Sequence, residues 1–79
     1  MYYFYILISD LDMKYYYGST KDLINRFKQH QNGEVTSTKC MRPLRLVYYE
    51  AYTTRQKAVF REKQVKNSGA VRANLHKRI

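Results

Sequence analysis

The sequence has little cysteine, few acidic residues and no long apolar run. Its only cysteine in 79 residues is Cys40, which excludes an internal disulfide and a zinc site built from cysteines. No apolar run approaches the roughly 20 residues of a membrane-spanning helix, and the apolar start shows neither a basic leader nor a small-residue cleavage site. We therefore expect a soluble, cytoplasmic protein without a membrane partner, in which Cys40 is partly buried like most free cysteines.

The scarcity of acids gives the chain a strongly positive charge. Six Asp and Glu oppose 15 Lys and Arg, for a formal net charge of +9. Such a field favours polyanions, and DNA or RNA are the expected partners. The basic residues that we expect to contact nucleic acid are Lys21, Arg26, Lys28, Lys39, Arg42, Arg61 and Lys66.

Aromatic residues are abundant, at 15% of the chain, and nine of them are tyrosines. With 44% hydrophobic residues the chain should fold, and its length leaves room for one domain, spanning 1–79. Each buried tyrosine brings a hydroxyl that needs a partner. We therefore expect some of these phenols to serve chemistry rather than packing.

Hydrophobic patterning predicts the element order β-β-α-β-α-α, which is an α+β fold. Thr20 and Thr54 are the expected N-caps of the first two helices, and Asn32-Gly33 and Ser68-Gly69 are the expected stops. The polar segment 34–43 is expected to be a loop. Strands are predicted at 2–9, 13–18 and 44–52, and helices at 21–31, 55–67 and 70–79.

The first two strands should form an antiparallel hairpin. If residues 9–12 make the turn, Ile8 faces Met13 and Tyr5 faces Tyr16. Directly opposed residues project to one face with Cβ atoms about 5 Å apart. The Tyr5 and Tyr16 hydroxyls could then converge on one ligand group, and a one-residue slip would separate them.

Two polar residues of the first helix share one of its faces. Arg26 and His30 are spaced i, i+4, beside the apolar stripe of Leu23, Ile24 and Phe27. A solvated helix face is the simple interpretation. The neighbouring tyrosine pair favours a functional site instead.

Glu62 is the only acidic residue beyond position 50, and it stands among lysines and arginines. It could form an exposed i, i+4 pair with Lys66, or it could bind a metal, because Mg²⁺ often uses one or two carboxylates and completes its shell with water and phosphate oxygens. Asp10 and Asp12 are expected to make turn hydrogen bonds. Asp22 is explained by the dipole of the first helix.

At these residues the chain resembles the GIY-YIG nuclease superfamily, above all its small single-domain members. Tyr3-Phe4-Tyr5 stands at the first motif and Tyr16-Tyr17-Gly18 at the second. Arg26 and His30 match the family arginine and the histidine or tyrosine one turn later, and Glu62 matches the metal-binding glutamate. Each match alone is weak, but the ordered set of five is specific.

The resemblance implies a small three-stranded antiparallel sheet flanked by helices and an endonuclease that hydrolyses DNA with one Mg²⁺ or Mn²⁺, with DNA repair as one setting. Glu62 would hold the metal, and Arg26 would clamp the non-bridging phosphate oxygens. Tyr5, Tyr16 and His30 would position and deprotonate the attacking water. Which of them is the base stays open.

Some positions depart from the family pattern. Tyr3 and Phe4 replace glycine and isoleucine of the first motif, and Ser19 stands where repair nucleases carry a lysine. A late family asparagine has no convincing counterpart in Asn67 or Asn74. Without a separate DNA-binding domain, we expect weak sequence specificity or selectivity for branched or structured DNA.

Two other functions fit the same charge. One is a non-catalytic nucleic-acid-binding module of this fold, and the other is an RNA-binding protein that uses exposed tyrosines as stacking platforms. The complete set of five site residues favours the nuclease, because a pure binder has no use for a lone acid among bases. The oligomeric state stays open, and we assume a monomer.

Overall fold

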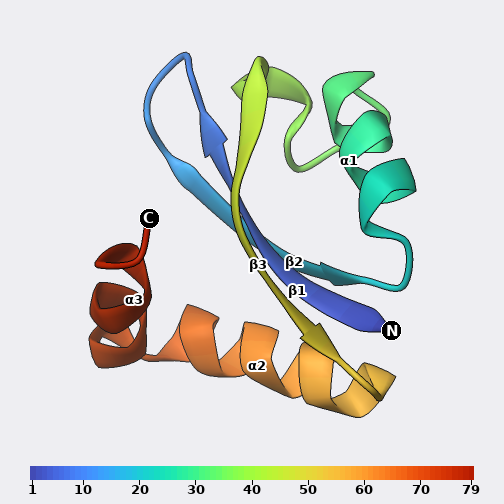
Figure 1. Ribbon diagram of the computed structural model, residues 1–79. Coiled ribbons are helices and arrows are strands. Elements are labelled where there is room, and N and C mark those ends of the chain that lie inside the picture. Colours follow the sequence, from blue (N-terminus) through green and yellow to red (C-terminus); the bar gives the residue numbers. More distant parts are fainter.

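The computed structural model describes residues 1–79 and has the predicted α+β architecture (Figure 1). A three-stranded antiparallel sheet has the strand order β2-β1-β3, with α1 on one face and α2 and α3 on the other (Figure 1). The elements are β1 (Tyr2–Ser9), β2 (Tyr15–Thr20), α1 (Leu23–Gln31), a 3₁₀ turn (Lys39–Met41), β3 (Leu44–Tyr52), α2 (Arg55–Asn67) and α3 (Gly69–His76).

The central strand β1 separates two apolar clusters. Its side chains alternate between the faces of the sheet, and its residues from position 4 to 9 are all buried because a strand covers each of its edges and helices cover its faces. The cluster under α2 and α3 consists of Phe4, Ile6, Val65 and Leu75. The cluster beside α1 consists of Tyr5, Leu7 and Leu44.

The hairpin register differs from the prediction by two residues. Ile8 pairs with Tyr15, and Tyr5 pairs with Gly18 rather than with Tyr16. The turn is shifted by one residue along the chain, since the Ser9 amide donates to the Lys14 carbonyl at 2.8 Å and this bond encloses residues 10–13 rather than 9–12. A shift of two residues leaves every side chain on its predicted face.

Side-chain contacts stabilise the shifted turn. The Asp12 carboxylate accepts from the Lys14 amide at 3.1 Å, as expected of a turn residue, whereas Asp10 forms an ion pair with Arg45 of β3 at 2.7 Å. Both aspartates are therefore structural, but of the two only Asp12 makes the expected turn hydrogen bond. The predicted register was wrong because it placed Ser9 in the turn, whereas Ser9 is the last residue of β1.

Helix α1 begins two residues later than predicted. Its N-cap is Asp22, whose carboxylate accepts from the Asn25 amide at 3.0 Å, and not Thr20. The apolar stripe is also narrower than predicted, because Ile24 is 73% exposed while Leu23 and Phe27 pack on the sheet. The predicted stop is correct: Asn32 caps the helix.

The structure shows how far individual side chains are exposed and whether any helix could cross a membrane. Cys40 is exposed and not partly buried, because the 3₁₀ turn that carries it lies on the surface. The side chain of Phe60, on α2, is 68% exposed. None of the helices has the length and apolar character needed to cross a membrane.

Candidate active site

Gly18 makes room for the Tyr5 side chain. The two residues pair across β1 and β2, and a Cβ atom at position 18 would lie 2.5 Å from the Tyr5 hydroxyl oxygen. Any side chain there would displace the ring. The absence of a side chain on Gly18 therefore lets Tyr5 cross β2 and reach α1.

The Tyr5 hydroxyl is the first group of a buried chain of hydrogen bonds. It lies 2.8 Å from His30 Nε2, and His30 Nδ1 lies 2.7 Å from Thr38 Oγ1. All three side chains are at most 1% exposed. Thr38 follows α1 in the segment 34–43, so a loop residue completes a network that starts on the central strand.

The hydrogen bonds of this chain define the tautomer of His30. Thr38 Oγ1 also lies 3.4 Å from the Val35 carbonyl oxygen. A carbonyl oxygen can only accept a hydrogen bond, so the Thr38 hydroxyl donates its proton there. Thr38 therefore accepts from His30 Nδ1–H, and His30 Nε2 accepts the proton of the Tyr5 hydroxyl. Burial, followed by the charge of Arg26, lowers the pKa of His30 from 6.5 to about 4, so the imidazole is neutral near pH 7.

The two tyrosines of the motifs differ in exposure. Burial raises the pKa of Tyr5 to about 12, and the neighbouring Arg26 only partly opposes this effect. Tyr16 is half-buried, and its ring centroid lies 6.4 Å from that of Tyr5 and 5.2 Å from that of His30. Tyr5 is thus a neutral, enclosed phenol, whereas Tyr16 reaches solvent.

Arg26 and Glu62 approach Tyr5 from different elements. Arg26 of α1 donates to Gln29 at 2.9 Å and acts on the Tyr5 hydroxyl, whose pKa it lowers. Glu62 of α2 acts on the same hydroxyl in the opposite direction. Because β2 is an edge strand, groups from both faces of the sheet can meet at its open edge.

Ser19 and Lys66 hold the Glu62 carboxylate. The Ser19 hydroxyl donates to Oε1 at 2.6 Å, and the Lys66 ammonium contacts Oε2 at 2.7 Å. The side chain of Glu62 is 20% exposed, so it can still reach a ligand. Ser19 thus takes a defined role at the position where the repair nucleases carry a lysine.

The donor set around Glu62 suits a hard cation that keeps most of its own water. No group of three or more acidic, histidine or cysteine side chains converges anywhere in the structure to hold a metal ion. A single carboxylate provides only one or two oxygen ligands, and Mg²⁺ tolerates this when water and phosphate oxygens complete the octahedron. The residues therefore fit a metal that binds together with a phosphate.

The basic residues predicted to contact nucleic acid differ in whether another group of the protein already binds them. Arg61 donates to Glu50 at 2.9 Å through Nε, and its charge is balanced within the protein. Lys66 is paired with Glu62. Arg42 is exposed and donates to the Lys39 carbonyl at 3.1 Å. Lys21, Lys28 and Lys39 are exposed and form no ion pair.

Thr38 and Ser19 are site residues that the sequence does not single out. Thr38 lies eight residues beyond His30 in a segment without hydrophobic periodicity, and Ser19 stood out only as a departure from the family pattern. Both act through one hydroxyl that contacts another site residue. Thr38 belongs to the run Thr36-Ser37-Thr38, and the sequence offers no signal for choosing among these three hydroxyls.

Comparison with known proteins identifies the family of this chain. A family model described as the GIY-YIG catalytic domain matches residues 1–74. A UPF0213 protein of Staphylococcus epidermidis is 39% identical over 64 residues, which cover 80% of this chain and 78% of the relative. A UPF0213 protein of Pediococcus pentosaceus is 38% identical over 66 residues, covering 82% and 68%. No solved structure matches the chain significantly. By its family match and its relatives, the chain belongs to the GIY-YIG family.

Proposed function

We propose that this protein is a divalent-metal-dependent endonuclease that hydrolyses DNA phosphodiester bonds with weak sequence specificity or with selectivity for DNA structure. The observation that carries the proposal is the surrounding of the Tyr5 hydroxyl: it bonds to His30 at 2.8 Å and responds to both Arg26 and Glu62. His30 contacts the Tyr5 hydroxyl directly, and the charges of Arg26 and Glu62 lie near enough to affect its pKa. The fifth site residue, Tyr16, packs beside Tyr5 and His30.

The exposures assign different roles to the two phenols. Tyr16, which reaches solvent, would bind the attacking water and, once its own proton has passed to solvent, would accept a proton from that water. Tyr5 and His30 are enclosed, and they would hold the Tyr16 ring in place through direct packing. Thr38 is a positioning residue, because it sets the tautomer of His30 without reaching the substrate.

Arg26 and Glu62 would handle the phosphate. The planar guanidinium of Arg26 suits two non-bridging oxygens and the charge that they gain during attack. Glu62 would hold Mg²⁺ or Mn²⁺ through one oxygen while Ser19 orients the carboxylate. The metal would supply a Lewis acid and stabilise the leaving oxygen.

Cleavage assays with one matched pair of variants test this proposal. Plasmid, flap and splayed-arm DNA are incubated with the protein in Mg²⁺ or Mn²⁺. Glu62→Gln keeps the shape of the side chain and should lower the cleavage rate by about 100-fold or more. Glu34→Gln, which changes an exposed glutamate outside the site, should leave the rate unchanged. No cleavage by the wild type with either metal would refute the enzymatic function.

A non-catalytic nucleic-acid-binding module is the second candidate. The contact between Lys66 and Glu62 favours it, because an ammonium group occupies one carboxylate oxygen. Such a module would bind DNA or RNA through several phosphate contacts, and its affinity would fall steeply with salt. Binding without cleavage, unaffected by Glu62→Gln, would select this candidate.

A further inference from the structure

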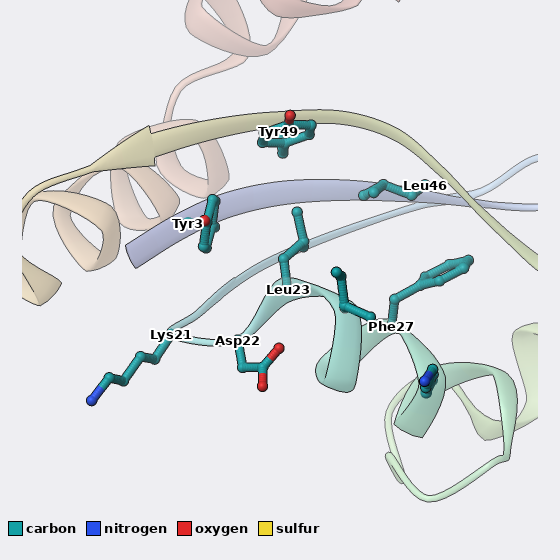
Figure 2. A pocket seen from close by; sticks show the side chains of 9 residues that line it. Tyr3, Lys21, Asp22, Leu23, Phe27, Leu46 and Tyr49 are labelled. Carbon is teal, nitrogen blue, oxygen red and sulfur yellow. The ribbon is translucent and has the colours of Figure 1, made fainter. Parts of the chain in front are cut away.

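A groove lies between α1 and the part of the sheet formed by β1 and β3. It has a volume of about 740 Å³, within the usual range of small-ligand sites. Figure 2 shows Tyr3 and Tyr49 on the sheet side and Leu23 and Phe27 on the helix side of the hollow. Six of the nine residues that line it are hydrophobic.

The aromatic wall of this groove is open to solvent. Tyr49 is 55% exposed, and its ring centroid lies 6.0 Å from that of Tyr3 with the planes inclined at 67°. Ile24, on the helix side, is 73% exposed. Exposed apolar surface gathered in one hollow indicates a binding site rather than scattered surface residues.

The groove adjoins the candidate active site across one strand pair. Tyr49 is the cross-strand partner of Tyr5, so their Cβ atoms are about 5 Å apart on the same face. Tyr3 precedes Tyr5 by two residues on that face, at about 7 Å along the strand. A ligand in the groove would therefore be a close neighbour of a group bound at the active site.

The charges at the rim suit a phosphate-bearing ligand. Lys21 and Lys28 both line the groove, and neither forms an ion pair. Asp22 also lies there, but its carboxylate caps α1. A second copy of this chain is a poor occupant, because two molecules of net charge +9 repel each other. Aromatic rings beside lysines are instead the surface that binds single-stranded nucleic acid.

We propose that this groove binds an unpaired nucleobase of a DNA strand, stacked on the exposed ring of Tyr49 with its edge against Tyr3, and with Lys21 and Lys28 on the flanking phosphates. A base inside a duplex cannot enter without being flipped out. The site would therefore favour DNA that has unpaired nucleotides beside the bond to be cut. The proposal rests on the proposed function only for the statement that this strand is cut.

The test measures binding without metal, so that cleavage cannot interfere. The probe is a single-stranded oligonucleotide carrying 2-aminopurine, and a duplex of the same sequence is its control. Wild type should quench the fluorescence of the single strand. Tyr49→Ala should weaken single-strand binding by about 5-fold to 150-fold, from 1 to 3 kcal/mol per stacked base, and leave duplex binding unchanged.

Three further variants make the result specific. Tyr49→Phe keeps the ring and should bind like the wild type. Phe60→Ala removes an exposed aromatic ring from α2, outside the groove, and should change nothing. Tyr3→Ala should weaken single-strand binding as well, and it decides the matter if Tyr49→Ala fails to fold, which circular dichroism would reveal.

Four outcomes of the binding test would overturn the proposal. These are equal weakening of single-strand and duplex binding by Tyr49→Ala, no quenching, a dimer in sedimentation that Tyr49→Ala dissolves, or much tighter binding of the same sequence as RNA. Because no metal is present, a chain without nuclease activity can still show stacking. Conversely, cleavage that Tyr49→Ala leaves intact on every DNA would refute the groove and not the nuclease.

Discussion

The two faces of the sheet are built differently. The face under α2 and α3 is closed by apolar contacts, in which Phe4, Ile6, Val65 and Leu75 are at most 1% exposed. The face beside α1 buries polar groups, His30 and Thr38 among them, and leaves an open groove at its side. One face is thus closed by a stabilising apolar core, while the other carries Tyr5, Arg26 and His30 of the candidate site. Glu62 is the exception, because it lies on α2.

Even the polar group on the closed face is structural. Glu50 accepts hydrogen bonds from Arg61 at 2.9 Å and from the hydroxyls of Tyr48 and Tyr52 at 2.7 and 2.6 Å. Burial alone would raise the pKa of Glu50, but these bonds hold it below its ordinary value. The Glu50 carboxylate is thus held by three side chains of the protein, whereas Glu62 is held by Ser19 and Lys66 only.

The largest expected effect is on the closed face. Leu75→Ala should lower the free energy of unfolding by about 2 to 5 kcal/mol, because it leaves a cavity under α3. Ile24→Ala on the open face should change it by less than about 0.5 kcal/mol, since that side chain is exposed. Urea unfolding measures both values, and similar losses for the two variants would contradict the division of roles.

A smaller effect should appear as pH dependence of the open face. Unfolded His30 takes up a proton near pH 6.5, whereas burial and Arg26 lower its folded pKa to about 4. The unfolded state therefore binds more protons between these values, and stability should fall by about 1 to 3 kcal/mol as pH drops from 6.5 to 4. Tyr5 and Tyr16 also face the imidazole, and burial raises the pKa of Tyr5 to about 12, far above this range.

Thermal unfolding between pH 6.5 and 5 isolates this contribution. Protonation of Glu50 also lowers the stability of the protein in acid, since the folded pKa of Glu50 lies below the ordinary 4.5. This loss of stability begins at lower pH than that caused by His30. His30→Gln should flatten the slope in the measured range. An unchanged slope in this variant would show that another group is responsible.

The smallest effect on stability, about 1 to 2 kcal/mol, is expected for Thr38→Val. The substitution keeps the shape and removes the acceptor for His30 Nδ1–H. His30 would then be free to exchange tautomers, so the pH profile of cleavage should change more than the affinity for DNA. Thr38→Ser should restore both. A normal profile for Thr38→Val would mean that Thr38 serves packing alone.

Local patterns predicted most of the elements. The bounds of β1, β3 and α2 agree with the prediction to the residue, because each begins or ends at a strong signal, such as the Thr54 cap whose hydroxyl accepts from the Lys57 amide. The start of α1 was missed because Thr20 and Asp22 are both good caps. Only the contact of Asp22 with the Asn25 amide decides between them.

The candidate site was predictable in its membership but not in its geometry. Tyr5, Tyr16, Arg26, His30 and Glu62 could be named from spacing and resemblance, and whether they act in catalysis stays a prediction. The hairpin register could not be obtained from spacing, because the Ser9 amide bonds to the Lys14 carbonyl and the turn begins one residue later than predicted. The predicted pairing of the two phenols survives as proximity on one face, since the shift was an even number of residues.

The sequence by itself determined the charge, the element order and the family, because these depend on composition and on short-range patterns. Only the tertiary structure decided that Gly18 admits the Tyr5 ring, that Thr38 orients His30 and that Tyr49 opens a groove beside the site. Each of these depends on residues far apart in the chain that meet through strand pairing or burial. A lack of acids pointed to nucleic acid, and the distribution of hydroxyls and rings on the α1 side of the sheet supports the proposed binding site.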